Sequence, residues 1–140
     1  EEYLIGLKEI LKDNLMLIMV QDDHGQQTAG GLFSIVSGLA QFHLGGTAND
    51  FMKHSPSKLM IDAAIEHCKS LGAHTLHFGG GFGSAHSDGL FRFKAGFGRE
   101  RHTFSTLRFI HCPNTYNKLL KNVNENSSTY FPEYRFLSEP

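Results

Sequence analysis

The feature that most constrains the fold is one helix placed between two predicted strands. Ser55 is expected to cap this helix, Pro56 suits its first position, and Gly72 suits its end. Strands are predicted before it, at 39–45, and after it, at 75–78. A strand, a helix and a second strand in this order predict a right-handed crossover between parallel strands. The apolar stripe of the helix consists of Met60, Ala64, Cys68 and Leu71.

Three predicted strands are joined by short turns, and the third of them is the first strand of that crossover. A continuous apolar run at 15–20 and a second strand at 28–36 lead into the strand at 39–45. Turn residues separate them at 22–25 and 37–38, which predicts an antiparallel meander. A short amphipathic helix is expected over 2–12. The chain is therefore predicted to be an α+β protein of mixed αβα type, with an antiparallel meander followed by a β-α-β crossover.

The segment after the crossover is predicted to contain shorter elements. Glycines punctuate a loop at 79–89, and a short helix is expected over 90–95. Alternating side chains predict a strand at 102–111, and Pro113-Asn114 opens a helix that extends to about residue 123. A final strand is expected at 130–137.

Length, charge and cysteine content limit the class of protein. A chain of 140 residues suits one domain, 1–140, and its missing initiator Met suggests the C-terminal part of a longer protein. Lys and Arg number 13 against 14 Asp and Glu, which excludes a protein that is basic overall. Cys68 and Cys112 cannot form a disulfide framework, so free thiols and a cytoplasmic location are expected. No apolar run approaches the ~20 residues of a membrane span.

Two groups of residues could bind a phosphorylated ligand. A basic window at 89–111 is one, although a solvated basic face explains such counts at least as well. Backbone donors form the other, at the helix start Ser55–Ser57 and at the strand end Gly79–Gly81. We expect these two segments to line one cleft, while glycine turns that need positive φ remain an equal alternative. The basic window contains Arg92, Lys94, Arg99, Arg101 and Arg108 against Glu100.

The histidines do not predict a metal site. His67 and Cys68 are adjacent and would point about 100° apart on a helix. His74 and His77 would face opposite sides of a strand. Surface or strand histidines are the simpler explanation, and no metal is expected. The sequence also lacks a G-x-S-x-G elbow and a G-x-x-x-x-G-K-[ST] loop.

Three segments in order resemble the GNAT-fold acyltransferases, and most of all their Fem-type branch, the peptidoglycan bridge aminoacyltransferase-like proteins. These segments are 55–60 at the helix start, Leu76-His77-Phe78-Gly79-Gly80-Gly81, and Gly89 to Gly98 with its Phe-Lys and Gly-Phe pairs. The similarity covers roughly 28–120. Relatives add amino acids or acyl groups to cell-wall precursors and other amines. Fem-type proteins commonly carry two GNAT domains, so this chain would be the second.

The resemblance implies a mechanism and a set of site residues. The two parallel strands would splay near their ends, and an acyl donor would lie in the gap and pair with strand backbone. An acceptor amine, on a small molecule or a cell-wall precursor, would attack the donor carbonyl, and the oxyanion would need a stabilising donor. The acyl donor would be acyl-CoA or aminoacyl-tRNA, the latter making tRNA a partner. By resemblance the catalytic candidates are Lys94 and, two positions before it, Arg92. The binding candidates are His43, Leu44, Ser55, Ser57, Lys58, Gly79, Gly80, Gly81 and Phe93.

Two departures from the acetyl-CoA enzymes leave the function open. Residues 51–56 lack the glycines of the Q/R-x-x-G-x-G/A loop that holds the pyrophosphate. The tyrosine often used as a general acid is missing, because its place falls near Phe91 or Arg92. A Fem-type acyl or aminoacyl transfer to an amine fits both departures. The alternatives are an acyl-CoA-dependent N-acetyltransferase acting on a small amine or sugar, and a GNAT-like domain that binds a ligand without catalysis.

Overall fold

A computed structural model describes residues 2–81, 88–120 and 131–135. The chain divides into two compact units, Glu1–Arg99 and Glu100–Pro140. Each unit is described by itself. No helix in the described part of the chain has both the length and the apolar character needed to cross a membrane.

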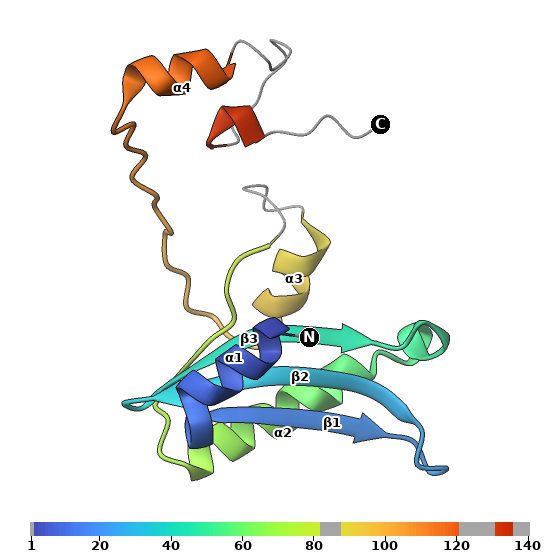
Figure 1. The fold of residues 1–140 in the computed structure, drawn as a ribbon. Helices are drawn as coiled ribbons and strands as arrows, with labels where there is room; N and C mark the ends of the chain where they lie inside the picture. The colour runs from blue at the N-terminus through green and yellow to red at the C-terminus, as the bar shows by residue number, and fades with distance from the viewer. Residues whose placement is uncertain (1, 82–87, 121–130, 136–140) are drawn as a thin grey trace. The chain divides into compact units, whose positions relative to one another are not determined.

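The first unit is built on a four-stranded sheet in the order β1-β2-β3-β4 (Figure 1). The strands are β1 (Leu15–Gln21), β2 (Gln27–Val36), β3 (Leu39–Thr47) and β4 (Thr75–His77). The first three pair antiparallel, and β4 pairs parallel to β3. The predicted meander and crossover are therefore confirmed.

Helix α2 (Pro56–Ser70) covers one face of this sheet and builds the core (Figure 1). Phe33 of β2 is fully buried against three residues of the predicted helical stripe and its flank, Met60, Ile61 and Ala64. Met16, Ile18 and Val20 of β1 pack against the same core. Burial of Met60, Ala64 and Cys68 at this spacing fixes the helix on the sheet, whereas Leu71, also predicted in the stripe, lies past the helix end and is 56% exposed.

Helix α1 (Glu2–Leu11) lies over the opposite face of the sheet and buries none of its residues (Figure 1). A short 3-10 turn, η1 (Lys12–Asn14), connects it to β1. The alternate residues of β1, Leu17 and Met19, remain 64% and 44% exposed on this side. The continuous apolar run of β1 therefore faces a packed core on one side and an incompletely covered surface on the other.

Strands β3 and β4 pair only at the beginning of β3. The partners are Leu39–Gln41 and Thr75–His77, whereas β3 continues to Thr47 without a strand partner on that side among the described residues. The register with β2 also shifts, because Leu32 pairs with Leu44 while Phe33 pairs with Phe42. His43 is thus the extra residue of a β-bulge, which bends the strand where pairing with β4 stops.

The helix starts differ from the sequence prediction at one position. Ser55 does not cap α2 with its side chain, so that prediction is wrong. Ser55 has the left-handed φ of 52°, and its N–H donates to Met52 O at 3.1 Å at the end of η2 (Asn49–His54). A side-chain cap needs extended φ and ψ at that position. Asp88 does cap the short helix α3 (Gly89–Ala95), where it accepts from the Phe91 N–H at 2.7 Å.

The second unit contains α4 (Pro113–Leu120) and the 3-10 turn η3 (Glu133–Arg135). Tyr116 is its buried residue, and its ring lies 6.1 Å from that of Phe131 and 5.5 Å from that of Tyr134. The helix predicted from Pro113 is confirmed to Leu120, and its expected end near 123 lies outside the described residues.

Both strands predicted after residue 100 are wrong where the structure describes them. Residues 102–111 form no strand, and Phe104 and Leu107 are 88% and 96% exposed. Apolar side chains occur on both sides of this alternating pattern, and a strand is stable only when a partner satisfies its backbone. Residues 133–135 of the expected final strand form η3, and residues 130, 136 and 137 lie outside the described residues.

Candidate functional site

An aromatic cluster lies beside the opening between β3 and β4. Phe42 of β3 stacks on Phe33 with ring centroids 5.0 Å apart and meets Phe78 edge-on at 6.5 Å. Phe97 lies 5.8 Å from Phe78 and 5.3 Å from Phe93 of α3. Phe93, one of the binding candidates, packs against the core. The cluster anchors α3 next to the end of β4.

Lys94 joins α3 to the glycine segment after β4. Its Nζ donates to Gly80 O at 2.7 Å and lies 5.8 Å from the ring centroid of Phe42. Partial burial lowers the pKa of Lys94, and the nearby Asp88 carboxylate partly opposes that shift. The hydrogen bond to Gly80 O and the contact with the Phe42 ring hold the Lys94 ammonium in place, while part of the side chain remains exposed to solvent. Lys94 is therefore a positioned cation beside the opening.

The glycines after β4 are required by the backbone and by close packing. Gly79 has a φ of 71°, which other residues rarely adopt. A Cβ on Gly81 would lie 2.5 Å from Asp88 Oδ1 and 2.9 Å from Phe91 Cβ. The glycine segment thus packs closely against the start of α3. Lys94, near the other end of the helix, adds a hydrogen bond to the same segment.

The bulge residue His43 has a partner on α1. The Tyr3 hydroxyl lies 2.5 Å from His43 Nε2, and the two rings stack with centroids 5.9 Å apart. Leu44, the next residue, lines a cavity between α1 and the sheet. The two candidates from β3 are therefore placed at the bulge, on the side of the sheet that α1 covers.

The start of α2 borders a cavity at one end of the sheet. Ser55 and Lys58 line a cavity of about 550 Å³ together with His54 and the ends of β1 and β2. Gly79, Gly80 and Gly81 are not among its lining residues. Ala48, just after β3, donates its N–H to Thr28 O at 2.9 Å, so the chain leaves the sheet beside β2 before it enters η2. That the start of α2 and the glycine segment line one cleft stays a prediction.

The remaining candidates are placed apart from these contacts. Ser57 lies in the first turn of α2 and lines neither of the two cavities described for the first unit. Arg92 is exposed on α3, two residues before Lys94. The structure therefore brings together Gly79–Gly81, Phe93 and Lys94, and separately Ser55 and Lys58.

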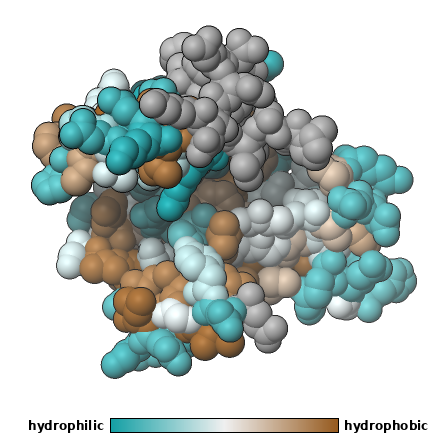
Figure 2. Space-filling view, turned by 45° about the horizontal axis from the view of Figure 1, so that its top comes forward, coloured by the Kyte–Doolittle hydropathy of each residue, from teal (hydrophilic) through white to brown (hydrophobic). Residues whose placement is uncertain are grey.

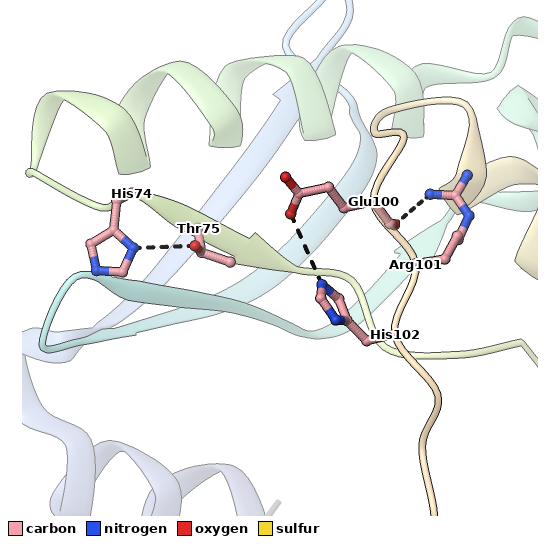
Figure 3. Close-up of polar contacts among 5 residues, drawn as sticks. All are labelled: His74, Thr75, Glu100, Arg101 and His102. Atoms are coloured by element: carbon pink, nitrogen blue, oxygen red, sulfur yellow. Dashed lines mark hydrogen bonds and ion pairs between the residues drawn. The ribbon is translucent and has the colours of Figure 1, made fainter.

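The basic window is divided between the two units. Arg92 and Lys94 belong to α3 and Arg99 ends the first unit, whereas Arg101 and Arg108 belong to the second. There Arg101 Nη1 donates to Glu100 O at 2.7 Å, and His102 Nε2 lies 4.0 Å from Glu100 Oε2 (Figure 3). Both side chains of the latter pair are largely exposed, so this ion pair contributes little stability.

His74 has a structural explanation at the turn between β2 and β3. Its N–H donates to Gly38 O at 2.9 Å, and its ring covers the place where Gly38 would carry a Cβ. Its Nδ1 lies 3.1 Å from Thr75 Oγ1 (Figure 3). Within the described ranges, no three His, Cys, Asp or Glu side chains gather in a group that could hold a metal ion.

Sequence reasoning missed Tyr3, Phe42, Asp88 and Phe97. The Gly45-Gly46 pair was the available signal for Phe42, because a Cβ on Gly45 would lie 2.5 Å from the Phe42 ring. Asp88 before Gly89 was a recognisable cap. Nothing in the sequence connected Tyr3 to His43, since the pair depends on a bulge in β3.

Comparisons with known proteins agree with this fold. The sequence model of the FemAB family matches residues 8–103. The aminoglycoside antibiotic 6'-N-acetyltransferase AAC(6')-Ih from Acinetobacter baumannii is similar in structure, with a TM-score of 0.53, 10% identity and coverage of 80% of this chain and 81% of that one. Glucosamine-6-phosphate N-acetyltransferase from Arabidopsis thaliana gives a TM-score of 0.51 at 13% identity, over 76% and 75%. A search of curated proteins found no match.

Proposed function

We propose that this chain, which belongs to the FemAB family and is an acyltransferase of the GNAT type, forms an amide between an activated acyl donor and an amine acceptor. The opening between β3 and β4 would receive the donor. Beyond Gln41, no described strand pairs with β3 on the β4 side, so its backbone can pair with an extended substituent of the donor. The single observation that carries the proposal is the placement of Lys94 beside this opening.

The reaction needs an electrostatic partner for the oxyanion. The lone pair of the amine attacks the donor carbonyl, the carbonyl oxygen gains negative charge, and the bond to the leaving group then breaks as the amide forms. The amine loses a proton to solvent, and the leaving group departs as a thiol or a hydroxyl. Lys94 already donates to a carbonyl oxygen, that of Gly80, so its ammonium is oriented toward a group of the same kind.

The variant Lys94→Ala tests this role. Losing a positioned donor is expected to cost about 2–4 kcal/mol in transition-state stabilisation, or roughly 30- to 1000-fold in kcat/KM. Unfolding free energy should fall by only about 1 kcal/mol, because one hydrogen bond is lost. The measurement is acyl transfer to a panel of amines, and a free energy of unfolding from urea denaturation.

Arg92→Ala is the matched control on the same helix. Arg92 is exposed, and we expect its removal to leave kcat/KM within a factor of about three. If Arg92→Ala abolished turnover while Lys94→Ala did not, the role would move to Arg92. If neither variant changed turnover, the assignment of this segment to acyl transfer would be wrong.

The donor divides the proposal into two forms. In the Fem-type form the donor is an aminoacyl-tRNA or another activated acyl group and the acceptor is an amine of a cell-wall precursor. The second form is an acyl-CoA-dependent N-acetyltransferase acting on a small amine or sugar, and the two similar structures, both named N-acetyltransferases, favour it. Assays with acetyl-CoA and with charged tRNA, using the same acceptor panel, distinguish the two forms.

The cellular setting is part of the same proposal. Cys68 and Cys112 are both free thiols, which favours a reducing compartment and supports the cytoplasm. We also propose that the chain functions as one GNAT-like domain of a longer protein. Mass analysis of the protein isolated from its own cells would test both points.

A further inference from the structure

We propose that the cavity between α1 and the sheet binds the apolar chain of the acyl donor. The cavity has a volume of about 590 Å³, which lies in the range of small-molecule sites. This inference rests on the proposed acyl transfer and adds the chemical class of the donor. Its lining residues are Leu4, Lys8, Leu15, Met16, Leu17, Gly30, Gly31, Leu32, Leu44, Gly45 and Gly46.

Four glycines on β2 and β3 form the floor of the cavity. Gly30 pairs with Gly46, and Gly31 pairs with Gly45, so the four lie as neighbours in the sheet. Glycines weaken a strand, and such a group marks a place where another group approaches the backbone closely. Side chains at Gly31 and Gly45 would point to the α2 face, toward Met60 and Phe42, whereas side chains at Gly30 and Gly46 would point to the α1 face.

The filled positions show what the open one lacks. A Cβ on Gly31 would lie 2.7 Å from Met60 Sδ, one on Gly45 would lie 2.5 Å from the Phe42 ring, and one on Gly30 would lie 2.7 Å from Met19 Sδ. A Cβ on Gly46 would have no atom within 4 Å. Gly46 therefore keeps an open space in the floor that nothing else in the described chain fills.

The cavity and the proposed acyl-transfer site share one strand, β3. Leu44, Gly45 and Gly46 line it, and these residues belong to the part of β3 that has no partner on the β4 side. A donor whose carbonyl lies in the opening could therefore extend its chain around β3 into the cavity. The bulge at His43 lies where the chain would pass.

The charge of the lining favours an acyl chain over an amine. Lys8 carries the only formal charge among the described residues that line the cavity, and the rest are apolar or glycine. A cationic acceptor or an aminoacyl group would meet a like charge there. Apolar surface also gathers in the lower left of Figure 2, on the side where α1 lies in Figure 1. Leu4 and Leu44 are each 48% exposed on this side, so burying a chain against them is favourable.

Calorimetry with decanoyl-CoA, acetyl-CoA and free decanoate tests the inference. Each fully buried methylene strengthens binding by about fourfold, so burial of only two of them makes decanoyl-CoA bind more than about tenfold more tightly than acetyl-CoA. Gly46→Leu should remove that preference, because a Cβ at this position meets no atom within 4 Å and the added side chain would occupy the cavity floor. Gly98→Leu, at an exposed glycine that also has open space, should keep the preference.

A second variant guards against a folding defect. Leu4→Trp fills the cavity from α1, a helix with no buried residue, and should also remove the preference. Equal affinity of the native chain for both esters would overturn the inference, as would a preference that persists in both filling variants. If neither thioester binds, the measurement with free decanoate is used instead. Decanoate binding that Gly46→Leu abolishes supports the inference, and no decanoate binding to the native chain overturns it. Failure of chain-length preference would leave acyl transfer from a short donor and the Lys94 test untouched.

Discussion

Both faces of the sheet carry apolar side chains and glycines, but they differ in how completely these residues are buried. On the α2 face, Phe33, Ile61 and Ala64 are fully buried, and side chains fill the space over Gly31 and Gly45. On the α1 face, Leu17 and Leu44 remain about half exposed or more, and Gly46 opens into a cavity. Apolar composition alone therefore does not produce a core, because a core also requires an element long enough to bury it. We attribute the first face to stability and the second to binding.

The largest effect that separates the faces is expected from truncating one apolar side chain on each. Ile61→Ala should lower the free energy of unfolding by about 2–4 kcal/mol, because it removes a fully buried side chain and leaves a cavity. Leu17→Ala should lower it by less than about 1 kcal/mol, since Leu17 is largely exposed. Urea denaturation of both variants measures the two values.

Equal losses at the two positions would contradict this assignment of the faces. They would mean that α1 buries Leu17 in solution as fully as α2 buries Ile61. Leu39→Ala is a further control, because Leu39 is exposed at the start of β3 and is not among the residues that line the cavity between α1 and the sheet.

A smaller effect is expected from adding a methyl group to glycines on the two faces. Gly31→Ala places its Cβ 2.7 Å from Met60 Sδ and 2.9 Å from Phe33, so overpacking should cost about 1–3 kcal/mol. Gly46→Ala meets nothing and restricts the unfolded chain, so stability should be unchanged or rise by up to about 1 kcal/mol. Thermal unfolding of the two variants gives the comparison.

The signs of these two changes matter more than their sizes. If Gly46→Ala destabilised the protein as much as Gly31→Ala does, the space above Gly46 would be closed in solution. The proposed binding cavity would then lose its floor.

The part of this organisation that the sequence predicted is the part fixed by periodicity. Met60, Ala64 and Cys68 share a helix face, so α2 and its two flanking strands followed from spacing. The strand at 102–111 was wrong because its apolar residues alternate without a clean polar face, and a strand depends on a partner elsewhere in the chain. The spacing of apolar residues shows which face of a helix or strand is buried, but it does not show which strand pairs with which.

The candidate site was predictable in its residue types and not in its contacts. Lys94 and Phe93 were found through the Phe-Lys pair, and Gly79–Gly81 through a glycine run at a strand end. That Lys94 bonds to Gly80 depends on how α3 returns to β4, which no local pattern encodes. The bulge at His43 likewise arises from a register shift between β2 and β3, so the contact with Tyr3 could not be anticipated.

The smallest effect concerns a thiol on the packed face. Cys68 is buried on α2, and burial raises the pKa of its thiol above 9.0, although a backbone hydrogen bond partly opposes the shift. A raised pKa means that the folded state keeps the proton longer than the unfolded state does. The stabilisation is fully present below the unfolded pKa and is lost as the pH rises through the folded pKa. The free energy of unfolding should therefore fall above about pH 9, by less than about 1 kcal/mol from this group.

Cys68→Ala isolates this contribution, and Cys112→Ala is its control because Cys112 is exposed in the second unit. Removing Cys68 lowers stability at every pH, so the informative quantity is the change between pH 7.5 and pH 9.5 under reducing conditions. That change should shrink in Cys68→Ala and stay native-like in Cys112→Ala, because lysine and tyrosine titrations are common to all three proteins. If Cys68→Ala kept the native change, the thiol would be open to water, and the α2 face would be less completely packed than the side chains around Gly31 indicate.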